Sequence, residues 1–167
     1  MKRAIAIGSA MAIALCAVVT LAAQGKDFSG KWTADAPAAG AAAGGGGGGG
    51  HGGGGMGGGP MTIAMDAKTM TITRTTQAGE SKTAYNLDGS DSKNPGRGGA
   101  GGAAPADVVS NAKWDGATLV ITTKGANGAG DTTAKYSLDG AKLKVENTRP
   151  GRNGGDPTTT TTTYTKG

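Results

Sequence analysis

"DFSGKWTAD", residues 27–35, lies between an apolar N-terminus and a long glycine tract. The stretch places Phe28, Gly30 and Trp32 at alternate positions, in a chain whose aromatic content is only 4%. Alternate residues of a β-strand point to the same face of a sheet. The spacing therefore predicts a first strand whose two aromatic side chains share one face.

The same two-residue period recurs in the rest of the chain. After the glycine tract, Met61, Ile63 and Met65 alternate with Thr62 and Ala64, and later stretches rich in Thr, Val, Ile and Tyr alternate in the same way. Such alternation is typical of half-buried strands, and helical spacing is found only in the apolar N-terminus. The predicted strands cover residues 28–35, 61–65, 69–76, 81–87, 108–114, 118–123, 131–138, 142–147 and 158–165.

Asp-Gly pairs separate several of these strands. Asp115-Gly116 and Asp139-Gly140 each lie between two alternating runs, and Asp-Gly favours the positive φ angles of tight hairpin turns. Short hairpins join antiparallel neighbours, so we expect an all-β, antiparallel up-and-down meander of eight or nine strands. Because an open sheet of this length would expose its edges, the meander is expected to close into a barrel.

A repeated segment supports the meander. "MDAKTMTITRTTQAGESKTAYNLDG" (residues 65–89) aligns with "WDGATLVITTKGANGAGDTTAKYSLDG" (residues 114–140). Each copy holds an Asp turn, an apolar alternation, a glycine-containing loop and the sequence Tyr-x-Leu-Asp-Gly. We interpret the two copies as a duplicated two-stranded unit.

The N-terminus is typical of an export signal. Lys2 and Arg3 precede a run of small and apolar residues that ends in small residues around Ala23, as a signal peptidase requires. The run is shorter than the ~20 apolar residues of a membrane-spanning helix. We therefore expect a signal peptide over residues 1–23, a single domain over residues 24–167, and export to the periplasm or the extracellular space with no stable membrane span after cleavage.

Two glycine-rich stretches interrupt the predicted domain. Residues 40–60 are nearly all Gly and Ala, and residues 94–107 are similar but shorter. Such sequences lose much conformational entropy on ordering and bury little surface, so both stretches are expected to be disordered loops.

The composition excludes several classes of function. Cys16 is the only cysteine and lies in the leader, so the mature chain has neither disulfide nor thiol chemistry. Removing Lys2 and Arg3 with the leader lowers the net charge from +5 to +3, and the remaining basic residues are spread along the chain. A nucleic-acid partner would need a denser basic cluster.

Catalytic and metal-binding residues are not identifiable either. His51, the only histidine, lies in the first glycine tract with nothing to orient it as a base or metal ligand. "DGSDSKN" (residues 88–94) resembles the start of a calcium loop, but Gly99 stands where an EF-hand has its glutamate, and a polar turn is favoured. We predict no enzymatic activity, no metal site and no cofactor.

The first predicted strand carries a family resemblance. Gly30-Lys31-Trp32 resembles the first-strand signature of lipocalins and other calycin barrels. The leader, "DFSGKW" and "KWDGATLVITT" (residues 113–123) together resemble small uncharacterised secreted bacterial proteins with lipocalin-like domains. The resemblance implies a lipocalin-like barrel that holds a small hydrophobic molecule. In such a barrel Trp32 can plug one end, and Gly30 lets another segment approach closely.

Two functions stay open. In the first, the barrel binds a small apolar ligand, since methionine adapts to irregular shapes. In the second, the same side chains fill the interior, and the protein is a solid structural or surface-interaction protein that contacts an envelope polymer. The candidate lining residues are Met61, Ile63, Met65, Met70, Ile72, Tyr85, Trp114 and Tyr136. The threonine tract, residues 158–163, is read as the closing strand rather than as an array that binds water or carbohydrate.

Overall fold

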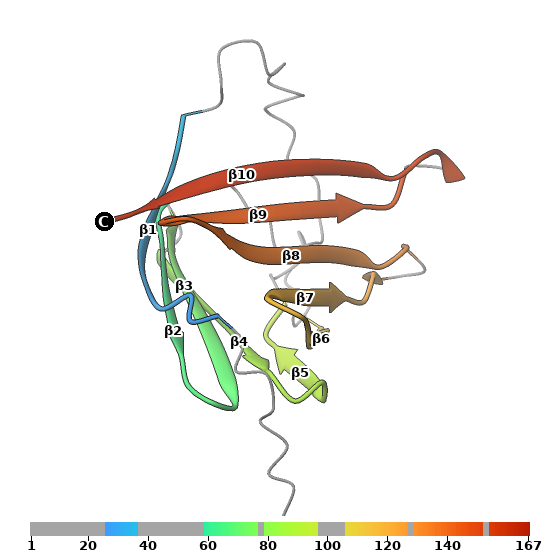
Figure 1. Ribbon diagram of the computed structural model, residues 1–167. Coiled ribbons are helices and arrows are strands. Elements are labelled where there is room, and N and C mark those ends of the chain that lie inside the picture. Colours follow the sequence, from blue (N-terminus) through green and yellow to red (C-terminus); the bar gives the residue numbers. More distant parts are fainter. Residues whose placement is uncertain (1–25, 37–58, 77–78, 97–105, 127–128, 152–153) are drawn as a thin grey trace, which may run out of the picture.

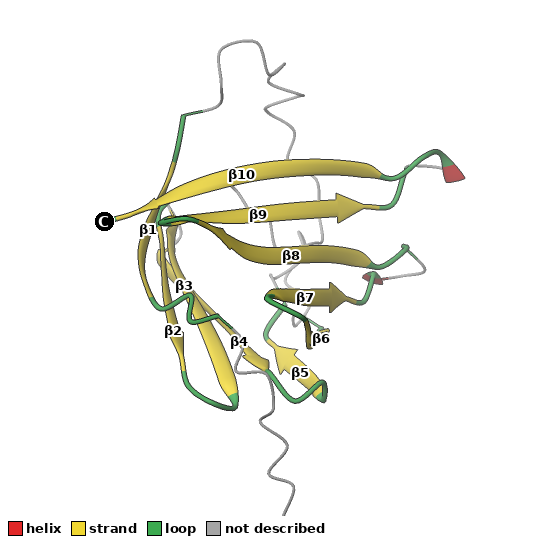
Figure 2. Ribbon diagram, in the orientation of Figure 1, coloured by secondary structure: helices red, strands yellow, loops and turns green. Residues whose placement is uncertain are grey.

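The computed structural model describes residues 26–36, 59–76, 79–96, 106–126, 129–151 and 154–167, which form ten β-strands (Figure 1). Within these ranges, helical geometry is confined to isolated turns at Ala126 and Gly154 (Figure 2). No helix in the described ranges has the length and apolar character needed to cross a lipid bilayer. The strands are β1 (Gly30–Ala34), β2 (Met61–Met65), β3 (Thr69–Thr76), β4 (Gly79–Asn86), β5 (Asp91–Asn94), β6 (Val108–Asp115), β7 (Thr118–Thr123), β8 (Thr132–Asp139), β9 (Lys142–Arg149) and β10 (Thr158–Lys166).

The ten strands form one sheet in the order β4-β3-β2-β1-β10-β9-β8-β7-β6-β5. Every ladder is antiparallel, and all but the β1–β10 ladder join strands that follow one another in the chain. In Figure 1 the strands β2–β4 run steeply across β7–β10, so the two halves of the sheet face each other as the walls of a nearly closed barrel. The predicted all-β, antiparallel up-and-down meander that curls into a barrel is confirmed.

The strand count exceeds the prediction by one. The nine predicted strands are all present, each within two residues of its expected bounds. The additional strand, β5, occupies residues for which the sequence favours a polar turn followed by a loop. Its inward side chains are Ser92 and Asn94, both buried, so it lacks the apolar alternation that identifies the other strands.

The connections of the meander leave the barrel at two ends. Tight turns join β2–β3, β4–β5, β6–β7 and β8–β9 at one end, which we call the turn end. Gly116 and Gly140 have φ angles of 60° and 59° in two of these turns, which confirms the prediction from the Asp-Gly pairs. The other five connections leave the opposite end, which we call the mouth.

Several sequence expectations lie outside the described residues. They are the signal peptide over residues 1–23, the whole of the first glycine tract except Gly59 and Pro60, and the central part of the second. His51 lies in the first of these tracts. Asn94, the first residue of the second tract, is the last residue of β5.

The apolar core fills the barrel toward the turn end. Its members come from every strand except β5, and each is at most 6% exposed. The chain segment before β1 also contributes to the core through Phe28. The buried apolar residues are Phe28, Trp32, Met61, Ile63, Met70, Ile72, Tyr85, Ala112, Leu119, Ile121, Ala134, Tyr136, Leu143, Val145 and Tyr164.

Phe28 packs beneath the sheet at the turn end. Its ring centroid lies 5.6 Å from that of Trp114 and 6.3 Å from that of Tyr136. The indole N–H of Trp32 donates to the Phe28 carbonyl over 2.8 Å, which requires the chain to fold back because four extended residues span about 13 Å. β1 therefore begins at Gly30, two residues later than predicted. Gly30 redirects the chain with a φ of 139°, which favours glycine.

Replacing Phe28 by alanine tests this closure. Because the side chain is fully buried, we expect Phe28→Ala to lower the free energy of unfolding by about 3–5 kcal/mol, from lost burial and the cavity left behind. Urea unfolding followed by tryptophan fluorescence measures the change. Lys31→Ala, at an exposed position of β1, is the control and should change stability little; equal losses in the two variants would contradict the assigned role.

The two copies of the repeat have the same register. In each copy, the residue before the Asp turn pairs with the first apolar residue of the next strand, which in turn pairs with the tyrosine of the strand that follows. The first copy supplies β3 and β4, and the second supplies β7 and β8. The corresponding sets are Met65, Met70 and Tyr85 in the first copy and Trp114, Leu119 and Tyr136 in the second.

The ladder between β1 and β10 joins the two halves of the sheet. Its three residue pairs are extended by the Asp35 N–H, which donates to the Thr163 carbonyl over 2.8 Å. The Asp35 carboxylate accepts hydrogen bonds from Lys142 Nζ at 2.8 Å and Thr165 Oγ1 at 2.6 Å. These bonds, that from Lys142 first, lower the pKa of Asp35 below its ordinary value, so the group is ionised and bonded at neutral pH.

Side chains connect the two edge strands, β4 and β5. The Asn94 side chain accepts from the Ala84 N–H and donates to the Ala84 carbonyl, each over 2.8 Å. Ser92 Oγ accepts from the Asn86 N–H over 2.7 Å, and Asn86 Nδ2 donates to the Asp91 carbonyl over 3.1 Å. The Asn94 amide thus makes the two hydrogen bonds to Ala84 that the backbone of a neighbouring strand would otherwise make. We call these side-chain contacts of Ser92 and Asn94 with β4 the seam.

Asn94→Ala should weaken the seam. It removes the hydrogen-bond partner of both the N–H and the carbonyl of Ala84, at a cost of about 1–3 kcal/mol for each group that stays out of water. We expect the free energy of unfolding in urea to fall by roughly 2–4 kcal/mol. Lys93→Ala, at the adjacent exposed position, is the matched control, and a loss no larger than that of Lys93→Ala would show that the seam does not hold the barrel.

Candidate ligand-binding site

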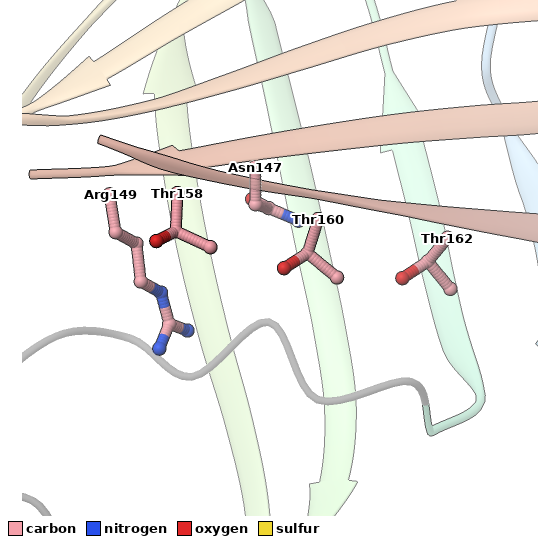
Figure 3. Close-up of a pocket in the computed structure, with 5 residues that line it drawn as sticks. All are labelled: Asn147, Arg149, Thr158, Thr160 and Thr162. Carbon is pink, nitrogen blue, oxygen red and sulfur yellow. The ribbon is translucent and has the colours of Figure 1, made fainter. Parts of the chain in front are cut away.

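The inner faces of β9 and β10 change from apolar to polar toward the mouth. On β9 the buried Leu143 and Val145 are followed at the same spacing by two polar residues, and on β10 three threonines precede the buried Tyr164. These five polar side chains point to the same side of the two strands and line a hollow of about 220 Å³ (Figure 3). They are Asn147, Arg149, Thr158, Thr160 and Thr162.

The hollow is open to solvent. Arg149, Thr158 and Thr160 are exposed although they lie on the inner face of the sheet, whereas Asn147 and Thr162 are half-buried. Each threonine presents a hydroxyl group and a methyl group. The lining can therefore hydrogen-bond a ligand and also cover small apolar groups.

Polar side chains continue around the inner rim of the mouth. Ser92 pairs with Ser110, Ser110 with Thr123, and Thr123 with Thr132 across four strands. The Ser110 and Thr123 hydroxyl groups are hydrogen-bonded over 2.9 Å. Arg149 and Thr158, paired across β9 and β10, extend this row, so polar side chains line the rim from β5 to β10.

Charged side chains of the described strands are divided between the two faces. Arg74 follows the buried Met70 and Ile72 at the same spacing on β3, and Arg149 follows Val145 on β9, so both arginines belong to the inner face. The acidic residues alternate with the buried positions and therefore lie on the outer face. They are Glu80, Asp91, Asp115, Asp139 and Glu146.

Arg74 lies half-buried against the tyrosines of the interior. Its Nη2 atom donates to Met61 Sδ over 3.3 Å, and its guanidinium lies close enough to the Tyr136 hydroxyl to favour the ionised phenol, against the larger effect of burial on the pKa of Tyr136. Burial raises the pKa of Tyr136 and of Tyr85 above the ordinary tyrosine value, so both phenols are neutral at neutral pH. Tyr136 pairs with Val145, which pairs with Thr162 of the hollow.

Six of the eight candidate lining residues are core residues in this structure. They are 0–6% exposed, whereas Met65 and Trp114 are partly buried against the same core. Other side chains line the hollow. Ligand contact by the eight residues stays a prediction. The six core residues are Met61, Ile63, Met70, Ile72, Tyr85 and Tyr136.

The two residues of the first-strand signature lie near the turn end. Trp32 is 2% exposed, and the Lys166 ammonium lies 5.6 Å from its ring centroid. The Lys166 side chain also passes Gly30 so closely that a Cβ there would lie 2.5 Å from Cε. The segment that approaches Gly30 is thus the end of the closing strand, β10.

The residues around the hollow can be located in the sequence by extending the two-residue period of the neighbouring apolar residues. The threonine tract is correctly interpreted as a strand, but the inner members of the tract are identified only by counting back from Tyr164 in steps of two. The same step from Val145 reaches Arg149. The two-residue alternation of inner and outer positions therefore continues from the apolar part of each strand into its polar part.

The described ranges contain no group of three or more His, Cys, Asp or Glu side chains that could hold a metal ion. The Asp88 carboxylate accepts bonds from the Ser90 N–H at 2.8 Å and the Ser90 hydroxyl at 2.6 Å. These contacts explain Asp88 as a turn residue.

No known protein family and no curated protein matches this chain in sequence. Among solved structures, the chain is similar to the "REP1-NXSQ fatty acid transporter", with a TM-score of 0.48 and 14% identity over 65% of this chain and 69% of that one. It is also similar to wild-type fluorescent protein UnaG, with a TM-score of 0.47 and 19% identity over 65% of this chain and 72% of that one. The fold assignment rests on the strand order and register described above.

Proposed function

We propose that this protein is a small-molecule-binding barrel whose ligand enters the mouth and lies over the inner faces of β9 and β10. The observation that carries the proposal is the hollow of about 220 Å³ that polar inner-face side chains of β9 and β10 line at the mouth. Its volume is below the ~300–1,000 Å³ of sites for drug-sized molecules, so the ligand is small.

The lining favours a ligand with both apolar and polar parts. The buried Val145 and Ala134 pair with the lining residues Thr162 and Asn147, so the apolar core adjoins the hollow, and the threonine methyl groups add apolar surface to the lining itself. Asn147, Arg149 and the threonine hydroxyls provide hydrogen bonds around it. A wholly apolar ligand lodged among the six core residues would have to displace side chains that are already packed.

We also propose that the protein is exported, as the basic and apolar N-terminus favours. Expression of the full chain in a Gram-negative bacterium, followed by fractionation and N-terminal sequencing, tests this proposal. A product that starts near Gln24 outside the cytoplasm would support export. An unprocessed chain in the cytoplasm would contradict it.

Titration with N-phenyl-1-naphthylamine, an uncharged probe that fluoresces in apolar surroundings, tests the binding function. We expect saturable binding of one probe per chain, and we expect Thr160→Phe to weaken it at least tenfold because the ring fills the hollow. Thr161→Phe introduces the same ring at the next position of β10, on the outer face, and should leave the affinity within about twofold, since it leaves the hollow unchanged.

The alternative function makes a different forecast for the same titration. A solid structural or envelope-interaction protein would give no saturable binding, or a weak response that Thr160→Phe and Thr161→Phe change equally. Either result would contradict a ligand site in the mouth. It would favour the second function considered from the sequence.

A further inference from the structure

We infer that the hollow recognises an oxyanion, a carboxylate, phosphate or sulfonate group, and that Arg149 is the side chain that binds it. The inference rests on the proposed function, because it names the chemical class of the ligand that the mouth admits. The structure carries it through the placement of the charged side chains.

The two faces of the sheet differ in the charges that they carry. Every acidic side chain of the described strands lies on the outer face, and both arginines of these strands lie on the inner face. The ion pairs Lys82–Glu80, Lys142–Asp35 and Lys144–Glu146 are all outside the barrel. All three of these pairs are made by lysines, and both strand arginines lie on the face where the described strands place no carboxylate.

The chemistry of the lining also favours an oxyanion. Arg149 shares the hollow with Asn147 and three threonines, all of them neutral, so none of the described lining side chains supplies a negative charge to it. A guanidinium presents a planar fork of N–H donors that matches two oxygen atoms of a carboxylate or phosphate. The amide of Asn147 and the neighbouring hydroxyl groups can donate to the oxygen atoms that Arg149 leaves.

Arg74 provides a second guanidinium group on the inner face. Arg74 contacts Tyr136, and Tyr136 leads through Val145 to Thr162 in the register of β8–β10. Arg149 pairs with Thr158 at the other end of the hollow. Arg74 thus adds a second positive charge to the inner face of the barrel, and two positive charges on one face favour an anionic ligand.

The arrangement also orients the ligand. Arg149 is exposed at the mouth, whereas the core side chains close the turn end. The oxyanion therefore lies at the rim, and the apolar part of the ligand points toward Val145 and Ala134.

A matched pair of probes tests the inference. 1-Anilinonaphthalene-8-sulfonate has the ring system of N-phenyl-1-naphthylamine and adds a single sulfonate. We expect the sulfonate probe to bind at least tenfold more tightly to the purified protein, and we expect its affinity to fall as salt is added.

Arginine variants show whether Arg149 is responsible. Arg149→Ala should weaken sulfonate binding at least tenfold more than it weakens binding of the uncharged probe, since only the anion gains from the charge of the guanidinium. Arg149→Lys, which keeps the charge but loses the planar fork, should be intermediate. Lys135→Ala removes an equally exposed positive charge from the outer face of β8 and should not change either affinity, which controls for the net charge.

Competition distinguishes the possible sources of the oxyanion. Displacement of the sulfonate probe by decanoate but not by millimolar inorganic phosphate would identify the head group of an amphiphile. Displacement by inorganic phosphate alone would identify a free oxyanion. Both results support the inference, and both are expected to disappear in Arg149→Ala.

Other outcomes overturn the inference without affecting the binding function. Equal affinity for the two probes, or equal losses in Arg149→Ala and Lys135→Ala, would show that the mouth binds small molecules without recognising an anion. If neither probe binds, the proposed function itself fails. The two failures are therefore distinguishable in one set of titrations.

Discussion

The pairing of β1 with β10 is the contact on which the rest of the molecule depends. It joins four strands from the first part of the chain to six from the second through three residue pairs, with two flanking backbone bonds from Asp35 to Thr163 and from Gly167 to Lys31. Without it, the two parts would be separate sheets, each with one apolar face in water. Because the apolar residues of both parts belong to one core cluster, burial of that surface stabilises a short ladder that would be weak alone.

The opposite junction of the barrel is made in another way. Between β4 and β5, Asn94 and Ser92 supply the hydrogen bonds that a neighbouring strand would otherwise supply. Side chains of this kind satisfy an edge at fixed points, whereas a ladder satisfies it along its whole length. The barrel is therefore continuous at β1–β10 and only locally bridged at β4–β5, and the edge strands avoid the exposed pairing groups that promote aggregation.

Much of this architecture could be predicted from the sequence because burial repeats at every second residue. The apolar alternation identifies nine strands, and the Asp-Gly pairs identify turns between them. The alternate positions of Phe28 and Trp32 indicate that one face of the first strand is buried. β5 cannot be recognised from the sequence because its inward residues, Ser92 and Asn94, are polar. They are buried because they hydrogen-bond backbone groups of β4, and the sequence pattern does not reveal that contact. The hollow could not be predicted for a related reason. Arg149 and the threonines of β10 continue the two-residue spacing of the inner face, but polar side chains do not indicate whether they point into the barrel or toward solvent.

The division of the barrel into two ends has a consequence for how such a protein diversifies. The turn end is constrained by short turns of defined φ and by the packing of Phe28, so changes there disturb the core. The four longest connections, β1–β2, β5–β6, β7–β8 and β9–β10, all leave the mouth, around its polar rim. Lengthening or rewriting them leaves strand register unaltered while changing what an incoming molecule meets, much as variable loops on a rigid scaffold do. Selection can thus retune specificity in these segments while the frame beneath them keeps its geometry.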